Sequence, residues 1–248
     1  MDQSVFKPLH SPRCTVACSS CNLREICLPV GLTQEELQYI DHRLVSSRRK
    51  VPRGAKLFQE GDRFTAIYAI WTGFFKTCVS WRDGREQVTG FQMGGELLGL
   101  DGIDSEKYEV DAVALEDSQV CAIPYPEFRR LAQRIHTLQA QFDRIMSHEI
   151  VRNHGVMLLL GSMHSEERLA AFLLNLMHRL SARGFSSSEI VLRMSREEIG
   201  SLLGLKLETV SRTFSKFQAN GLLSVQHRNI QIIDPQGLQQ LLDHPAAE

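Results

Sequence analysis

The chain has 248 residues, of which 43% are hydrophobic and 23% charged, and its 28 basic and 29 acidic residues leave a net charge of -1. This is the composition of an ordinary globular protein. It excludes a collagen-like, disordered or polybasic chain, and the length suits two domains. No stretch approaches the roughly 18 apolar residues that span a bilayer, and residues 1–14 lack the apolar core of a secretion signal. We therefore expect a cytoplasmic protein without a membrane segment.

Residues 1–30 form a cysteine-rich segment that holds four of the six cysteines. In a reducing compartment, such clustering indicates metal binding rather than a disulfide framework. The pattern C-x2-C-x5-C is formed by Cys18, Cys21 and Cys27. Three thiolates at this spacing suit zinc or an iron–sulfur cluster equally well. Cys14 or Cys121 could supply the fourth ligand, and a disulfide switch is a third alternative.

Residues 31–136 are expected to form a β-rich domain. Thr33 followed by Glu36 has the spacing of a capping box, which predicts a short helix at the start of this domain. Nine glycines then punctuate short apolar segments, and Asp83-Gly84 is typical of a hairpin turn. Strands are predicted at 66–71, 74–80, 87–91 and 119–123. Many short strands with frequent turns indicate a sandwich, barrel or jelly roll. Cys78 lies within a predicted strand, where a cysteine usually behaves as a small hydrophobic residue, and the nine histidines show no ligand spacing.

Residues 137–163 are predicted to form one long helix of about seven turns. Its apolar positions mostly follow spacings of three, four and one: Leu138, Phe142, Ile145, Met146, Ile150, Val156, Met157 and Leu160. Helices of this length usually bury such a seam against another element, often a second copy of the chain. The alternative is packing against the chain's own strands.

Residues 164–248 are expected to form a second domain. A helix over 166–183 ends at Gly184, and Ser195 with Glu198 forms a capping box that opens another helix. Gly204 then allows a sharp turn into a helix over 207–219, and strand-like segments follow on either side of a turn at 227–229. This order predicts a winged helix-turn-helix. The alternative is an αα-hairpin with a solvated charged face.

The second helix of this motif presents polar side chains in its first two turns, where a recognition helix meets base edges. Arg212 could donate two hydrogen bonds to guanine, Glu208 could accept from cytosine, and Ser211 could do either. The candidate phosphate contacts are Arg196, Lys206, Thr209 and Lys216. The sequence therefore predicts binding to double-stranded DNA.

Several motifs together resemble the CRP/FNR transcription factors. They are LFQEGD (57–62), the segment 70–73, GGELLG (94–99), the long helix and LKLETVSR (205–212). Within that family the cysteine pattern resembles the FNR (fumarate and nitrate reduction regulator) branch. VCAIP (120–124), EQVTGF (86–91), SEERLAAF (165–172) and RGFS (183–186) resemble the same branch. The resemblance covers about residues 18–235.

The resemblance implies an α+β fold: an N-terminal β jelly roll like cyclic nucleotide-binding domains, a dimerisation helix and a C-terminal winged helix-turn-helix. It implies that a 4Fe–4S cluster is ligated by Cys18, Cys21, Cys27 and Cys121. The implied dimer contacts are Phe142, Ile145, Met146, Ile150, Asn153 and Met157. The implied base-reading residues are Glu208, Ser211 and Arg212, on a two-fold site with TTGAT-like half-sites.

The resemblance also implies a mechanism. An intact cluster favours the homodimer that binds DNA, oxygen converts the cluster to a 2Fe–2S form, and DNA is released. The family activates or represses genes through RNA polymerase, for which the loop at 83–85 is a candidate contact. In two places the sequence departs from the pattern: Cys14 is an extra thiol, expected to be a bystander, and Asn153 replaces an acid of better-known members. Removing like charges from a two-fold seam predicts a tighter dimer and a slower response to oxygen.

Other functions are less consistent with the sequence. A cyclic nucleotide pocket of this family needs an arginine just after the GEL segment, but residues 98–112 contain none, and Lys107 is the sole cation there. A zinc-stabilised regulator without a redox role remains an alternative. No P-loop, G-x-G-x-x-G, G-x-S-x-G or H-E-x-x-H motif is present, so we expect no enzyme.

Overall fold

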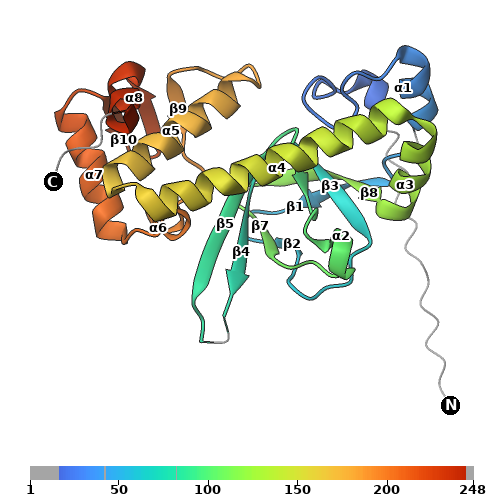
Figure 1. Ribbon diagram of the computed structural model, residues 1–248, viewed down its shortest axis with the longest axis horizontal. Helices are drawn as coiled ribbons and strands as arrows, with labels where there is room; N and C mark the ends of the chain where they lie inside the picture. Colours follow the sequence, from blue (N-terminus) through green and yellow to red (C-terminus); the bar gives the residue numbers. More distant parts are fainter. Residues whose placement is uncertain (1–16, 42, 82, 244–248) are drawn as a thin grey trace.

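One long helix, α4 (His136–Ser162), crosses the molecule, and the other elements are arranged along it (Figure 1). The computed structural model describes residues 17–41, 43–81 and 83–243. The cysteine-containing segment and α1 (Gln34–Ile40) lie near the start of α4, the β strands lie along its middle, and the C-terminal helices surround its end (Figure 1). None of the described helices has both the length and the hydrophobicity needed to cross a membrane.

The first domain is built from two antiparallel sheets. Before α4 the chain forms η1 (Cys18–Ser20), α1, β1 (Ser47–Val51), β2 (Lys56–Phe58), β3 (Ala66–Thr72), β4 (Phe74–Ser80), β5 (Glu86–Met93), β6 (Leu97–Leu98), α2 (Gly102–Ser105), β7 (Asp111–Ala114), β8 (Ser118–Pro124) and α3 (Tyr125–Arg134). The sheets have four strands each, in the orders β1-β8-β3-β6 and β2-β7-β4-β5. Side chains such as Ile70, Phe75 and Tyr108 fill the core between them.

Local sequence rules account for several element boundaries here. The predicted capping box is confirmed: the Thr33 side chain accepts from the Glu36 amide, and the Glu36 carboxylate accepts from the Thr33 amide. Gly84, with φ of 85°, turns the chain between β4 and β5. The four predicted strands coincide with β3, β4, β5 and β8 to within a few residues.

The two halves of α4 have different surroundings. In the first half, Leu138 and Phe142 are buried against the β domain, and the Phe142 ring lies 4.7 Å from that of Phe128. In the second half, Ile150, Met157 and Leu158 are 53%, 69% and 65% exposed. Packing on the chain's own domain therefore accounts for the first half of the seam and leaves the second half open.

The C-terminal part contains the predicted helix-turn-helix. It comprises α5 (Ser165–Ser181), β9 (Glu189–Val191), α6 (Arg196–Leu203), α7 (Leu207–Ala219), β10 (Leu223–Gln226), β11 (Asn229–Ile232) and α8 (Pro235–Asp243). The Ser195 capping box opens α6, and Gly204 closes it with φ of 63°. The hairpin turn is one residue shorter than predicted, because Asn229 pairs with Gln226 and His227 adopts a φ of 57°.

Candidate functional site

The cysteine segment folds as a series of tight turns. The Cys21 amide donates to the Cys18 carbonyl (3.2 Å), the Ile26 amide to Leu23 (3.0 Å), and the Val30 amide to Cys27 (3.1 Å). The Ser19 amide also donates to the Asp41 carboxylate at 3.1 Å, which joins this segment to the end of α1. The predicted ligands Cys18, Cys21 and Cys27 therefore lie on one compact loop.

The fourth predicted ligand, Cys121, comes from the middle of β8 but lies in the same neighbourhood. Cys18 and Cys27 pack against the hydrophobic cluster that contains Cys121. Burial, together with the nearby Cys27, Cys121, Asp41 and Cys21, raises the pKa of Cys18 to about 12. Burial also raises the pKa of Cys27 to about 12, with contributions from Cys121 and Cys21. The four thiols are thus close enough to affect one another.

The donor set fits a thiolate-ligated metal group by its chemistry. Thiolate sulfur is the ligand that iron–sulfur clusters and structural zinc prefer. Across residues 17–41, 43–81 and 83–243, no three His, Cys, Asp or Glu side chains are already placed to hold a metal ion. Binding would therefore draw the cysteine side chains together and displace their protons. Cys14 lies outside the described residues.

Cys78 has a different environment from the four candidate ligands. It lies on β4 in the other sheet and is fully buried. Burial, together with Glu86, raises its pKa to about 12. A buried, protonated thiol in a sheet packs as a small hydrophobic residue.

The recognition helix α7 separates a buried face from a polar one. Val210, Phe214 and Phe217 are buried against the rest of the C-terminal domain. The predicted base-reading side chains Glu208, Ser211 and Arg212 are all exposed on the first two turns. The spacing of apolar residues thus leaves these three polar groups facing outward together.

The four candidate phosphate contacts have different environments. Lys206 is exposed and Thr209 is partly buried. Lys216 is exposed but forms an ion pair with Glu166. The Arg196 guanidinium lies 3.2 Å from the centre of the Phe214 ring, and its buried Nη1 has no hydrogen-bond partner within the described part of the chain. Burial also lowers the pKa of Arg196 to about 10.

A cavity of about 340 Å³ lies between the β domain and α4. Its lining includes the carboxylates of Asp101 and Glu149, and burial raises the pKa of both. Arg152 also lines it, but this guanidinium is paired with Glu149 at 2.5 Å. Two carboxylates and an occupied arginine make a poor site for a phosphate group.

Sequence reasoning missed the role of Arg168. Its guanidinium donates to the carbonyls of Met163 (2.8 Å), Leu203 (2.9 Å) and Leu160 (3.0 Å). These bonds tie the end of α4 to the end of α6, which fixes the helix-turn-helix relative to the long helix. A single arginine on a helix gives no local indication of such a role.

Comparison with known proteins agrees with this architecture. Residues 48–135 match the cyclic nucleotide-binding domain, and residues 167–241 match the Crp-like helix-turn-helix domain. The chain is 49% identical over 225 residues to the transcriptional regulatory protein btr of Bordetella pertussis, covering 91% of this chain and 93% of that protein. It is 37% identical to the fumarate and nitrate reduction regulatory protein of Escherichia coli strain K12, covering 98% and 97%.

Among solved structures, FixK2 from Bradyrhizobium japonicum superposes with a TM-score of 0.73 at 29% identity, covering 82% of this chain and all of that one. Fold and relatives together define a transcriptional regulator that binds DNA through a helix-turn-helix, not an enzyme. The chain belongs to the CRP/FNR family, and within it to the FNR branch. Family members act as dimers, and the predicted fold class is confirmed.

Proposed function

We propose that this regulator senses oxygen in the cytoplasm through a 4Fe–4S cluster held by Cys18, Cys21, Cys27 and Cys121. The intact cluster stabilises a homodimer that binds two-fold DNA sites with TTGAT-like half-sites and activates or represses anaerobic genes. Oxygen converts the cluster to a 2Fe–2S form, which weakens the dimer and releases DNA. The observation that carries this proposal is the convergence of one loop and one distant strand on a shared, partly buried patch of thiols.

The open half of α4 supports a dimer. Its side chains at alternating spacings of four and three are Met146, Ile150, Asn153, Met157 and Leu160. This is the repeat by which two helices supercoil around each other. The exposed Ile150 and Met157 would be buried by a second copy, whereas the exposed Asn153 would face its symmetry mate near the two-fold axis.

The cysteine patch and the start of the seam share one hydrophobic cluster. Ile145 and Met146 pack partly buried against it, as do Cys18 and Cys27, and Phe142 is part of it. A group that draws the cysteines together therefore acts on packing beside the seam. Such a group shifts the monomer–dimer equilibrium only to the extent that it binds the dimer-competent packing of α4 more tightly than the other packing.

We assign DNA reading to the exposed face of α7. Arg212 would donate to guanine O6 and N7, Glu208 would accept from a cytosine amine, and Ser211 would bond an adjacent base edge. Lys206, Thr209, Lys216 and Arg196 would contact phosphates, which position the protein on the duplex. In a dimer, two such helices meet half-sites about one helical turn apart.

We assign the contact with RNA polymerase to the exposed hairpin loop at 83–85. Arg85 is 75% exposed at its side chain, and the neighbouring Trp81 is 47% exposed. An exposed aromatic beside an exposed arginine is typical of protein interaction surfaces.

Cyclic nucleotide is not the proposed effector. The cavity beside α4 contains two carboxylates, and its arginine is already paired. Lys107 does not line the cavity. Calorimetry with cyclic AMP should therefore detect no binding, whereas micromolar affinity would favour a nucleotide-responsive regulator.

The decisive experiment is purification without oxygen, followed by a visible spectrum and iron and sulfide assays before and after exposure to air. We expect a brown protein with about four irons per chain that bleaches and becomes monomeric in air. Cys121→Ser should abolish the colour, while Cys78→Ser serves as the matched control and should keep it. A colourless protein that carries zinc and dimerises regardless of air would instead support the zinc-stabilised alternative.

A further inference from the structure

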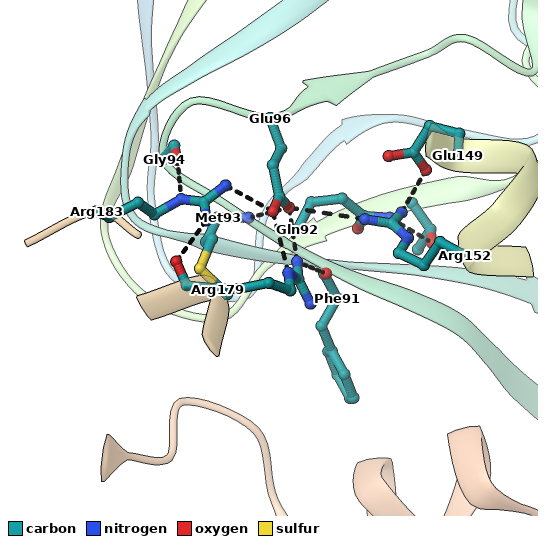
Figure 2. Close-up of polar contacts among 10 residues, drawn as sticks. Phe91, Gln92, Met93, Gly94, Glu96, Glu149, Arg152, Arg179 and Arg183 are labelled. Atoms are coloured by element: carbon teal, nitrogen blue, oxygen red, sulfur yellow. Dashed lines mark hydrogen bonds and ion pairs between the residues drawn. The ribbon is translucent and has the colours of Figure 1, made fainter. Parts of the chain in front are cut away.

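Glu96 joins the two domains through a buried ion-pair cluster (Figure 2). It lies in the turn between β5 and β6, and its side chain is 14% exposed. Arg179, on α5, reaches one carboxylate oxygen at 2.6 Å, and Arg183, just after α5, reaches the other at 2.7 Å. Two arginines from the DNA-binding domain thus converge on one carboxylate of the β domain.

The same arginines also bind the backbone around Glu96. Arg179 Nη2 donates to the Phe91 carbonyl at 2.6 Å, and Arg183 Nε donates to the Gly94 carbonyl at 2.6 Å (Figure 2). Burial would raise the pKa of Glu96, but Arg179, Arg183 and Arg152 together hold this pKa below its ordinary value. Glu96 is therefore ionised, and the end of α5 is fixed to this turn by several charge-assisted bonds.

The dimerisation helix reaches the same carboxylate. Arg152, on α4, places Nη1 3.8 Å from Glu96 Oε2 and pairs through Nη2 with Glu149 at 2.5 Å. Arg152 directly precedes Asn153, which lies on the open seam of α4. The Glu96 carboxylate thus lies close to arginines of both the long helix α4 and the C-terminal DNA-binding domain.

The cysteine loop packs against the backbone next to Glu96. A Cβ atom added at Gly95 would lie 2.9 Å from Ile26 Cδ1, and one added at Gly94 would lie 3.8 Å from Leu23 Cδ1. Leu23 and Ile26 both lie between Cys21 and Cys27. The turn that holds Glu96 therefore touches the loop that carries three of the four candidate ligands.

We propose that Glu96 is the junction through which the state of the cysteine loop reaches both α4 and the DNA-binding domain. When Leu23 and Ile26 pack against the backbone at Gly94 and Gly95, the turn holds Glu96 in place. In this position its carboxylate is within reach of Arg152, Arg179 and Arg183. When the loop relaxes, the carboxylate shifts and the arginines lose their common partner. The identity of the signal that changes the cysteine loop rests on the proposed function. The coupling from the loop through Glu96 to α4 and α5 does not.

The first test uses the protein without any cluster and therefore does not depend on the proposed function. Ile26→Ala loosens the contact of the loop with Gly95. We expect faster hydrogen exchange in the last turns of α5 for this variant in the wild-type background. In an E96Q background, hydrogen exchange in the last turns of α5 should already be fast, and Ile26→Ala should not increase its rate further. An equal increase in exchange rate in the wild-type and E96Q backgrounds would contradict the proposal that Glu96 is the junction.

A matched control is available at another contact between the domains. Arg193 Nε lies 2.7 Å from Glu116 Oε2, and this pair also links the two domains but does not involve the turn at Gly94 and Gly95. Like E96Q, E116Q removes one negative charge from an ion pair between the domains. The effect of Ile26→Ala on α5 should persist in this variant, which separates a specific junction from general loosening.

The second test uses the cluster-loaded protein. E96Q should retain the visible spectrum and the iron content, yet the ratio of DNA affinities before and after air should fall by roughly fivefold or more. E116Q should keep the wild-type ratio. An unchanged ratio in E96Q would overturn the proposal, whereas a wild-type protein without iron would overturn only the proposed function.

A graded variant keeps the proposal testable if E96Q does not fold, which circular dichroism would show. Arg183→Gln leaves Glu96 paired with Arg179 and should lose part of the coupling in the hydrogen-exchange experiment. Full retention of the coupling in Arg183→Gln would also contradict the junction.

Discussion

Arg48 on β1 lies directly opposite Cys121 on β8 in the antiparallel register. Residues so paired share a face of the sheet, with Cβ atoms about 5 Å apart. The Arg48 guanidinium reaches over the sheet to stack on Trp71 at 3.6 Å, and its buried Nε has no partner among the described residues. A fixed cation with an unused donor therefore lies beside a candidate ligand.

This arrangement predicts how Arg48 affects a bound cluster. Positive charge and hydrogen bonds near the sulfurs raise the reduction potential of an iron–sulfur cluster. Arg48→Gln should therefore make the cluster easier to oxidise and speed the loss of visible absorbance in air. Arg49→Gln is the matched control, because Arg49 is the next residue on β1 and faces Tyr68 on the opposite side of the sheet. Equal bleaching rates in the two variants would argue against a role for Arg48.

Arg212 should determine sequence preference at one base pair. Arg212→Ala removes a bidentate contact, and we expect it to cost about 1–3 kcal/mol of discrimination at a single guanine. Lys206→Ala should instead weaken binding to all sequences alike and reduce the salt dependence by about one ion. Fluorescence anisotropy with singly substituted duplexes at several salt concentrations distinguishes the two effects.

Asn153 should set the strength of the dimer. Asn153→Asp places like charges near the two-fold axis and should shift the protein toward monomer, while Asn153→Leu should tighten the dimer. His148→Asp adds the same charge on an exposed position of α4 away from the seam and should have little effect. Sedimentation equilibrium measures all three, and a cluster-free wild type that stays wholly monomeric at tens of micromolar would rule out a tightened seam.

The ion pairs of Glu96 predict a pH dependence of stability. Because the folded-state pKa of Glu96 lies below its ordinary value, these pairs stabilise the native state above the unfolded pKa of about 4.3. That contribution is lost as pH falls through the lower folded-state pKa. The difference in free energy of unfolding between wild type and Glu96→Gln should therefore be largest near neutral pH and shrink in acid. Urea unfolding across this range provides the measurement, and a difference that does not vary with pH would be inconsistent with these pairs.

Gly200 should be essential to the packing of the helix-turn-helix. A Cβ atom there would lie 2.5 Å from the Leu205 carbonyl oxygen, so Gly200→Ala must push α6 and the following turn apart. We expect a loss of about 1–3 kcal/mol in stability together with weaker DNA binding. Gly155→Ala, in α4 with nothing within 4 Å, should instead stabilise its helix by up to about 1 kcal/mol. Thermal unfolding of both variants tests the contrast.

Much of the fold followed from local sequence rules. The capping boxes at Thr33 and Ser195, and the turn at Gly204, are contacts between residues a few positions apart, and the structure confirms each. The polar face of α7 was also predictable, because helical periodicity alone decides which of its residues are buried. The short strand β9 was missed, since three residues carry too little pattern to identify a strand.

The contacts between distant parts of the chain were not predictable from local pattern. Glu96 and Arg183 lie 87 positions apart, and neither residue is unusual in its own segment. The GGELLG motif identified a resemblance but gave no indication that its carboxylate faces α5. The same holds for Cys121 as a fourth thiol, since spacing alone left Cys14 as an equal alternative.

The division of α4 into a buried first half and an open second half affects how the regulator responds to its own abundance. Leu138 and Phe142 bury the first half of the helix within one chain, so this half is packed without a partner. The proposed pairing through the open half would then obey mass action, and the paired fraction would rise with the number of copies in the cell. Regulation of its synthesis would therefore change the threshold of the response without any change in the sensing chemistry.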